Sequence, residues 1–332
     1  MWYENMKQYI HHTLILLAIA LFLETNIVTS INAQTINTPI ISVNQNGKET
    51  YTTIQEAIAN APPYTTINIC TGSYYEILTI EKPLTLIGED RDTTIIYSTS
   101  QPNKYTVKIT ASHVTLKNLN ITNKGSGLYT TGVRITAPHT TIQNCNIHHT
   151  PIGIVVWTTN NTIQDCTFWN CTDEGIALLG TLSLPCNNNQ ILRCTFYNNN
   201  DGIELQHASY NIITNCVFYH NTHTGIDAIT TSNNHNTISN CTIHHNDVHG
   251  IYLAASSYNH ITNCNITNNK NGNIITTKGS HNNTIKYHES TSSDSSNIGI
   301  RGEYSLQLIL IKLFKKLATN SPLLYILLIS KK

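Results

Sequence analysis

Two carboxylates stand at matching places in two successive copies of a short repeated segment. Glu204 follows Gly202 by two residues, and Asp227 follows Gly225 in the same way. If the copies are successive coils of a solenoid, matching side chains lie about 5 Å apart. Carboxylates that close raise each other's tendency to hold a proton, which suits acid–base chemistry such as retaining glycoside hydrolysis. With Asp201 in the preceding loop, they are candidate catalytic residues, although a solvated strand face also carries carboxylates that have no such role.

Other copies place different side chains at the same outward position. Arg134 and Tyr252 occupy it in two of them, and Trp157 lies close by in the sequence. An aromatic ring offers a flat apolar surface on which a sugar stacks, and a few polar groups beside it fix the orientation of a ligand. We therefore expect Arg134, Trp157 and Tyr252 to belong to a ligand-binding face.

Histidine is abundant in this chain, with 16 residues. His220 and His245 fall on neighbouring copies of the repeat, and His223 and His249 lie near them in the sequence. Imidazoles at such spacing bind copper or zinc, so these four are candidate metal ligands. The alternative is that His replaces Asn as a polar turn residue. Both methionines lie within the first six residues, which excludes a thioether copper(I) site from a mature chain that starts near Gln34.

The placement of these side chains depends on two interleaved repeats. The first has the form Thr-Ile-x-Asn-Cys-x-Ile/Phe, and its cysteines are 21, 28, 22, 25 and 23 residues apart. They are Cys145, Cys166, Cys194, Cys216, Cys241 and Cys264. The second repeat is a glycine followed by an aliphatic residue, at Gly132, Gly153, Gly175, Gly202, Gly225 and Gly250. Repeats of this length predict a solenoid, in which each unit buries its apolar side chains by stacking on its neighbours.

Cysteine and asparagine recur together at one point of the repeat. Equivalent cysteines on stacked coils would be about 4.8 Å apart, whereas a disulfide requires Cβ atoms about 3.8 Å apart. We therefore expect a ladder of buried free thiols, with a ladder of soft-metal ligands as the alternative. The preceding Asn tolerates left-handed backbone, so we expect it to make a tight bend and to hydrogen-bond from coil to coil. The asparagines in this position are Asn144, Asn215, Asn240 and Asn263.

Each repeat holds three short runs of β-branched and aromatic residues. Between residues 236 and 257 the runs are 237–238, 242–244 and 250–254, separated by Asn, His and Gly. Runs this short that alternate apolar with polar residues predict strands rather than helices. The predicted fold class is all-β, a right-handed single-stranded parallel β-helix with three strands per coil and about 9–11 coils.

The two ends of the chain differ from the repeats. Residues 1–33 have the pattern of a cleavable export signal, which predicts a secreted protein or one at the extracytoplasmic cell surface. The segments 34–50 and 291–304 are expected to be linkers on either side of a β-helix over residues 51–290. Its first part, 51–63, is expected to be a capping helix with Thr53 and Glu56 as a capping box. The hydrophobic and amphipathic tail, 305–332, is expected either to dock on the solenoid or to lie at a membrane surface.

The composition limits the class of partner. Charged residues make up 11% of the chain, and its formal net charge is zero. An average soluble protein carries about 25% charged residues. A nucleic-acid-binding protein needs a basic patch or groove, so nucleic acid is not an expected partner.

Three segments carry a family resemblance: Tyr51-Thr-Thr-Ile-Gln-Glu-Ala-Ile-Ala-Asn-Ala-Pro-Pro, Ile67-Asn-Ile-Cys-Thr-Gly-Ser-Tyr-Tyr-Glu and Leu84-Thr-Leu-Ile-Gly-Glu. They resemble the N-terminal cap and first coils of pectin-lyase-like β-helix proteins. The later repeats resemble those of the NosD group of periplasmic copper-associated proteins, and equally those of adhesin-like surface proteins of methanogenic archaea. The resemblance covers roughly residues 50–290 and implies the fold. It leaves the function open, because this solenoid hosts lyases, hydrolases, adhesins and metal-maturation factors.

The signature residues of the enzymes in that fold are missing from this sequence. It lacks the Gly-His-Gly and Arg-x-Lys motifs of polygalacturonases and the clustered calcium-binding aspartates of pectate lyases. We therefore favour an exported, non-catalytic, adhesin-like scaffold that binds a polysaccharide or cell-surface glycan. The first alternative is a NosD-like extracytoplasmic factor that binds copper, the one cofactor that the sequence suggests. The second is a polysaccharide lyase or glycoside hydrolase.

Overall fold

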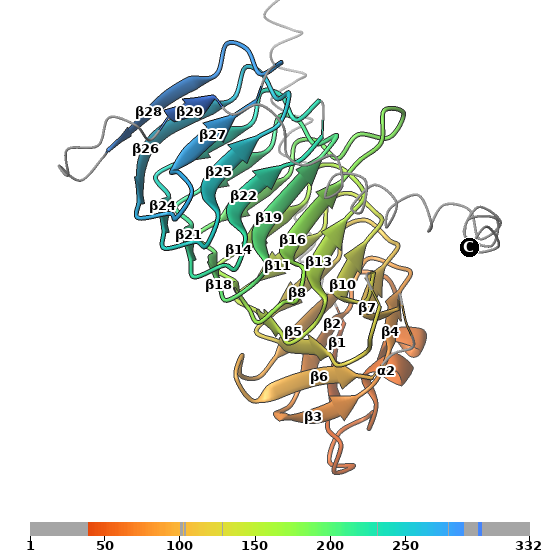
Figure 1. Ribbon diagram of the computed structural model, residues 1–332. Coiled ribbons are helices and arrows are strands. Elements are labelled where there is room, and N and C mark those ends of the chain that lie inside the picture. Colours follow the sequence, from red (N-terminus) through yellow and green to blue (C-terminus); the bar gives the residue numbers. More distant parts are fainter. Residues whose placement is uncertain are drawn as a thin grey trace, which may run out of the picture. The chain divides into compact units, whose positions relative to one another are not determined.

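The computed structural model describes residues 39–99, 102, 104–127, 129–230, 232–277, 279–288 and 298–300. The predicted export signal (1–33) and C-terminal tail (305–332) lie outside the described residues. The described chain forms a right-handed parallel β-helix with three strands in each regular coil (Figure 1). Every strand pair has parallel register, and equivalent strands of successive coils lie side by side.

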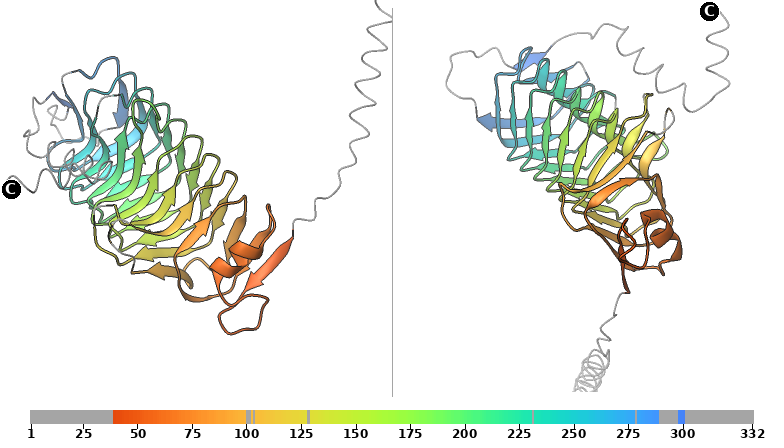
Figure 2. Two further views of the ribbon diagram at one scale, coloured as in Figure 1. Left: turned by 90° about the vertical axis from the view of Figure 1, so that its right-hand side faces the viewer. Right: turned by 90° about the horizontal axis from the view of Figure 1, so that it is seen from below.

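The strands form two sheets. Sheet A has 19 strands in two rows that meet at a sharp bend, and sheet B has ten strands (Figures 1 and 2). The first row of sheet A contains β1 (Ile40–Val43), β2 (Thr66–Ile69), β5 (Thr85–Gly88), β8 (Thr115–Lys117), β11 (Thr141–Gln143), β14 (Thr162–Gln164), β17 (Gln190–Leu192), β20 (Ile212–Thr214), β23 (Thr237–Ser239), β26 (His260–Thr267) and β28 (Thr284–His288). The second row contains β3 (Gly72–Tyr75), β6 (Thr94–Ser98), β9 (Asn120–Asn123), β12 (Asn146–His148), β15 (Thr167–Trp169), β18 (Thr195–Tyr197), β21 (Val217–Tyr219) and β24 (Thr242–His244), and it continues in β26. Sheet B contains β4 (Leu78–Ile80), β7 (Tyr105–Ile109), β10 (Thr131–Ile135), β13 (Ile152–Val156), β16 (Glu174–Leu179), β19 (Asp201–Gln206), β22 (Thr224–Ala228), β25 (His249–Leu253), β27 (Ile274–Thr276) and β29 (Ile298–Ile300).

The core runs along the axis of the coils and consists of stacked apolar side chains. Phe168, Phe196 and Phe218 stack face to face on successive rungs, with ring centroids 4.8 and 4.7 Å apart. In sheet B, Ile176, Ile203 and their equivalents are fully buried. Such stacks follow from the repeat, because each strand places alternate side chains inside the coil. Parallel in-register pairing then places equivalent side chains of successive coils on top of one another.

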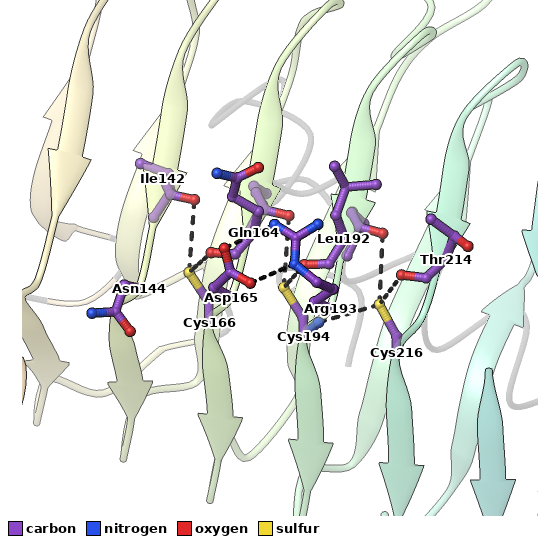
Figure 3. Close-up of polar contacts among 12 residues, drawn as sticks. Ile142, Asn144, Gln164, Asp165, Cys166, Leu192, Arg193, Cys194, Thr214 and Cys216 are labelled. Carbon is purple, nitrogen blue, oxygen red and sulfur yellow. Dashed lines mark hydrogen bonds and ion pairs between the residues drawn. The ribbon is translucent and has the colours of Figure 1, made fainter. Parts of the chain in front are cut away.

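The six repeated cysteines form the predicted ladder of free thiols. All six are buried and unpaired by disulfides. The Cys166 thiol donates to Gln164 O at 3.1 Å, and Cys194 lies on the next rung (Figure 3). Burial raises the pKa of the Cys145 and Cys166 thiols well above the usual value, so these thiols stay protonated and pack as small apolar groups. The soft-metal ladder stays a prediction.

The asparagines before the cysteines make the expected bend. Asn144, Asn215, Asn240 and Asn263 have φ values of 50°, 56°, 53° and 54°, in the left-handed region that Asn tolerates. The expected chain of amide hydrogen bonds between them is wrong. Within the described part of the chain, only the Asn144 side chain is bonded to a neighbouring rung, through Nδ2 to Asn118 Oδ1 at 2.8 Å. The other three amides are exposed, because the bend turns them toward solvent.

The amide ladders occur at two other turns of the coil. In the first, each backbone N–H donates to Oδ1 of the Asn on the next rung, and most of the side-chain amides do the same, as from Asn211 to Asn236 at 2.8 and 3.1 Å. The Asn236 amide donates instead to Ala208 O. The first Asn ladder contains Asn161, Asn189, Asn211, Asn236, Asn259 and Asn283. The second Asn ladder contains Asn199, Asn221, Asn246 and Asn269. These buried amides satisfy backbone N–H groups that the turns remove from the sheets.

The helix α2 (Ile54–Asn60) caps the N-terminal end of the core, as predicted, and buries Ile54, Ala57 and Ile58. The predicted capping box is not formed, since Thr53 makes no side-chain cap hydrogen bond. The carboxylate of Glu76 takes its place: its two oxygens accept the N–H groups of Ile54 and Gln55, both at 2.9 Å. A carboxylate from another element is thus placed where the helix dipole favours negative charge.

The parallel sheet extends beyond the limits expected from the repeats. Strand β1 lies within 34–50, which we expected to be a linker, and it pairs with β2 through Ile40–Val43. Strand β29 lies within the second expected linker, 291–304, and pairs with β27. Both strands are short apolar or glycine-containing runs, Ile-Ile-Ser-Val and Ile-Gly-Ile, which fit a parallel sheet but are too short to identify outside the repeat.

Candidate active site on the outer face of sheet B

The candidate catalytic residues lie in β19 and β22, which are flanked in sheet B by β16 and β25 (Figure 1). Glu204 of β19 is the register partner of Asp227 in β22, and Asp227 is in turn the partner of Tyr252 in β25. Their neighbours Ile203 and Leu205 point into the core and are buried. Strand alternation therefore turns Glu204 and its partners outward, and the repeat stacks them on successive rungs.

A second row of polar side chains lies at the start of the same strands. Glu174 is the register partner of Asp201, and Thr224 is the partner of His249. Each of these four residues directly precedes a repeated glycine. At Gly202 a Cβ atom would lie 2.5 Å from Gly225 O and 2.6 Å from the Phe218 ring, so only glycine allows the strand to begin so close to the core.

Asp201 and His223 make a close polar contact on this face. His223 Nδ1 lies 2.6 Å from Asp201 Oδ1 and 3.8 Å from Asp227 Oδ2. The backbone N–H of Thr224 also donates to Asp201 Oδ1, at 2.9 Å. A carboxylate that receives Nδ1–H orients the ring and leaves Nε2 to exchange a proton or to bind a ligand.

The carboxylates of this cluster are covered in the structure. The exposed fractions of Asp201, Glu204 and Asp227 are 0%, 1% and 2%. Tyr252 packs beside them and stacks on His249, with ring centroids 5.6 Å apart. Burial, and then the charge of Asp227, raise the pKa of Tyr252 above its usual range. The Tyr252 hydroxyl therefore stays protonated at neutral pH.

Arg134 and Trp157, which we expected on the ligand-binding face with Tyr252, lie apart from this cluster. Along the outward row, Val155 and Ala177 occupy the rungs between Arg134 and Glu204. The Arg134 guanidinium lies over the Trp157 ring, 5.3 Å from its centroid, and burial lowers the pKa of Arg134. The structure thus brings Tyr252 to the carboxylates and leaves Arg134 and Trp157 together at a second place on the face.

The four candidate metal-binding histidines fall in two places. His220 and His245 lie at corners of sheet A with φ values of 53° and 54°, and their ring centroids are 5.6 Å apart. Asn170 and Asn198 hold the equivalent corners of other coils, also with left-handed backbone. His and Asn thus share one corner position of the coil, and metal binding by His220 and His245 stays a prediction. His223 and His249 belong instead to the outer face of sheet B.

One set of side chains has the geometry of a metal site. Three or more His, Cys, Asp or Glu side chains could hold a metal ion where their possible ligand atoms all lie within 4.8 Å of one another. Within the described residues there is one such group, formed by Asp201, His223 and Asp227. Two carboxylates and an imidazole suit a borderline divalent ion such as zinc.

The contact between Asp201 and His223 was not predicted from the sequence. A signal was present: Glu174, Asp201 and His249 each occupy the position before a repeated glycine. Polar residues at one phase of a repeat share one edge of the stacked strands. The length of the loop from β21 to β22 decides that His223, one residue before this position, turns toward Asp201.

Comparison with known proteins agrees with this architecture. A family model described as the right-handed β-helix region matches residues 86–200 and 141–288. The chain belongs to the right-handed β-helix family. Comparison with curated proteins finds no match. None of the helices in the described part of the chain is long and apolar enough to cross a membrane.

Solved structures with the same fold include enzymes. The A-module of mannuronan C-5 epimerase AlgE6 from Azotobacter vinelandii is 16% identical, with a TM-score of 0.55 over 74% of this chain and 83% of that chain. The enzymatically active domain of tailspike protein 2 from bacteriophage CBA120 is 12% identical, with a TM-score of 0.64 over 80% of this chain and 46% of that chain. At these identities the similarity shows the fold alone.

Proposed function

We propose that this protein binds a polysaccharide on the outer face of sheet B and cleaves it by acid–base catalysis. The observation that carries the proposal is the register pairing of Glu204 with Asp227, next to the Asp201–His223 contact of 2.6 Å. Adjacent strands are about 4.8 Å apart, close to the separation of about 5–5.5 Å between the carboxyl groups of retaining glycosidases. The fold shared with a mannuronan C-5 epimerase and with the enzymatically active domain of a tailspike supports a carbohydrate substrate.

The neighbours of each carboxylate suggest its role. We assign the general acid to Glu204, whose partner on the preceding rung is the apolar Ala177. We assign the nucleophile to Asp227, because His223 lies 3.8 Å from its Oδ2 and a protonated imidazole there would favour the ionised carboxylate that a nucleophile requires. Asp201 is a positioning residue that orients His223.

Two conservative variants test the proposal. Glu204→Gln and Asp227→Asn keep the size of each side chain and remove its acid–base function, so we expect each to lower the cleavage rate about 10²–10⁴-fold. The release of new sugar ends would be measured over a panel of neutral and uronic-acid polysaccharides. Asp165→Asn, which changes a carboxylate on sheet A, is the matched control and should leave the rate unchanged. Failure of the parent to cleave any polysaccharide, or unchanged rates in both variants, would refute the catalytic assignment.

Burial of the carboxylates supports a second candidate function. Asp201, Glu204 and Asp227 are almost fully covered in this structure, as in a protein whose polar cluster stabilises the coils rather than turning over a substrate. In that case the protein is the non-catalytic, adhesin-like glycan-binding scaffold favoured by the sequence. A glycan array separates the two candidates, since the scaffold binds glycan with the same affinity before and after Glu204→Gln and releases no product.

We place either function outside the cytoplasm. The support is the export-signal pattern of residues 1–33. N-terminal sequencing of protein recovered from the culture medium or cell surface would test it, with a start near Gln34 expected.

A further inference from the structure

Two pairs of adjacent histidines have the same unusual geometry. The sequence Cys-x-Ile-His-His occurs at Cys145–His149 and at Cys241–His245. In each pair the second histidine has left-handed backbone, with φ of 49° at His149 and 54° at His245. The bend turns the second ring back on the first, so the two Nδ1 atoms lie 2.7 Å apart in His148–His149 and 2.8 Å apart in His244–His245.

This separation matches the spacing of two neighbouring ligands on one metal ion. Imidazole nitrogens lie about 2.0–2.1 Å from a bound first-row ion. Two nitrogens 2.8 Å apart that are each at that distance subtend an angle of about 85–90° at the ion. A tetrahedral ion would need them about 3.3–3.4 Å apart. The spacing therefore fits a square-planar or tetragonal ion, the geometry of Cu²⁺ and Ni²⁺.

The pair His244–His245 has a third imidazole beside it. His220, at the equivalent corner of the preceding coil, has its ring centroid 5.6 Å from that of His245 and 6.5 Å from that of His244. His220 and His245 are exposed, so their rings can turn toward an ion that the pair holds.

The pair His148–His149 differs because its outer nitrogens are already engaged. His148 Nε2 lies 2.8 Å from Asn120 Oδ1, and the Asn170 amide lies 3.2 Å from His149 Nε2. The Trp169 ring also stacks on His148, with centroids 4.1 Å apart. If the Asn170 amide donates to Nε2 of His149, that ring carries its proton on Nδ1, the atom that a chelated ion would need.

We propose that His244 and His245 chelate one Cu²⁺ or Ni²⁺ ion through their Nδ1 atoms, with His220 as a third ligand. One proton of the pair moves from Nδ1 to Nε2 when the ion binds, so that both neutral rings offer Nδ1 to the ion, and no net proton is released. The site shares no residue with the carboxylate cluster of sheet B and is independent of the function proposed there.

The experiment measures binding of Cu²⁺ and Ni²⁺ to the full chain, without an affinity tag, by calorimetry at pH 7.5. Cu²⁺ is also followed by electron paramagnetic resonance, which detects coupling to imidazole nitrogen. The test variant is His245→Asn, because Asn170, Asn198 and Asn268 hold the same corner with φ of 54°, 56° and 55°. The matched control is His149→Asn. We expect His245→Asn to weaken Cu²⁺ binding at least about tenfold and His149→Asn to leave it unchanged.

A second variant keeps the test valid if His245→Asn disturbs the fold. His244→Tyr introduces the residue of the preceding rung, Tyr219, on which His244 already stacks with centroids 5.5 Å apart. It removes one nitrogen of the chelate and should also weaken binding at least about tenfold, with loss of the nitrogen coupling. Three outcomes would overturn the proposal: no saturable binding by the parent, equal affinity in parent and both test variants, or an equal loss in His149→Asn.

Discussion

The coils turn at single residues with left-handed backbone, spaced five residues apart. In one coil these residues are Tyr210, Asn215 and His220, with φ of 58°, 56° and 53°. Left-handed backbone costs most L-residues about 1–2 kcal/mol and costs Asn less. The abundance of Asn in the chain follows from these corners and from the two buried Asn ladders, and many of the histidines replace Asn at the corners.

The buried amides should contribute far more to stability than the amides at the corners. Asn211→Ala removes the oxygen that accepts the N–H and the side-chain amide of Asn189, so we expect the free energy of unfolding to fall by about 2–4 kcal/mol. Asn215→Gly, at an exposed corner that glycine tolerates, should change it by less than about 0.5 kcal/mol. Urea unfolding followed by circular dichroism measures both. Equal effects of the two substitutions would show that the amide ladder is not a main stabilising feature.

His148 should make the fold sensitive to acid. Burial, and then His149 and Lys124, lower the pKa of His148 to about 4, whereas an unfolded histidine has a pKa of about 6.5. Between these values the unfolded chain binds a proton that the folded chain does not, so stability is complete above pH 6.5 and is lost as the pH falls toward 4. Allowing for solvent screening at this half-buried site, the loss is about 1–2 kcal/mol.

His148→Tyr tests this pH dependence, because tyrosine occupies the equivalent position in β18 and β21. We expect the difference in urea midpoint between pH 7 and pH 4.5 to be smaller in the variant than in the parent. An identical difference in the two proteins would assign the acid sensitivity to other groups.

At the scale of single elements, α2 shows that the tertiary structure determines which side chain accepts the free N–H groups at the start of a helix. Glu76 follows β3 and holds the N–H groups of Ile54 and Gln55. Thr53, which the local sequence predicts as part of a capping box, makes no side-chain cap hydrogen bond.

Glu76→Ala should therefore destabilise α2, and Thr53→Ala should not. Loss of two charge-assisted hydrogen bonds at a helix N-terminus costs about 1–2 kcal/mol, so amide exchange over residues 54–60 should become faster in Glu76→Ala. Thr53→Ala is the control and should exchange as the parent does. Faster exchange in Thr53→Ala alone would mean that the capping box forms in solution.

At the scale of the whole β-helix, the strands of each coil pair only with strands of the neighbouring coils, so a complete coil should be removable. Deletion of residues 145–165 joins Asn144 to Cys166 and removes one repeat of 21 residues. It takes out β12, β13 and β14 and leaves the candidate active site intact. Stacking of equivalent rungs is restored across the junction, because both sides carry the same side-chain pattern.

We expect this shortened protein to keep a β-sheet circular dichroism spectrum, to stay monodisperse on size exclusion and to unfold at a lower midpoint. A deletion of about half that length, residues 145–154, brings non-equivalent strands into contact and should prevent folding. A whole-coil deletion that aggregates like the half-coil deletion would contradict the independence of the coils.

The sequence by itself determined the β-helix, because a repeat of apolar positions fixes both the inward side chains and their stacking. The three strands per coil, the cap at α2 and the ladder of free thiols are all confirmed. The pairing of Glu204 with Asp227 is confirmed for the same reason, since both occupy one phase of the repeat.

The tertiary structure alone decided the contacts made by loops and side-chain ends. Three features depend on the path of the chain between strands, which the repeat does not encode. They are the capping role of Glu76, the contact of His223 with Asp201, and the distance of Arg134 and Trp157 from the carboxylates. The asparagine ladders were assigned to the wrong turn because every turn of the coil contains Asn. Whether an amide points inward or outward there depends on the backbone angles of the turn, which composition does not specify.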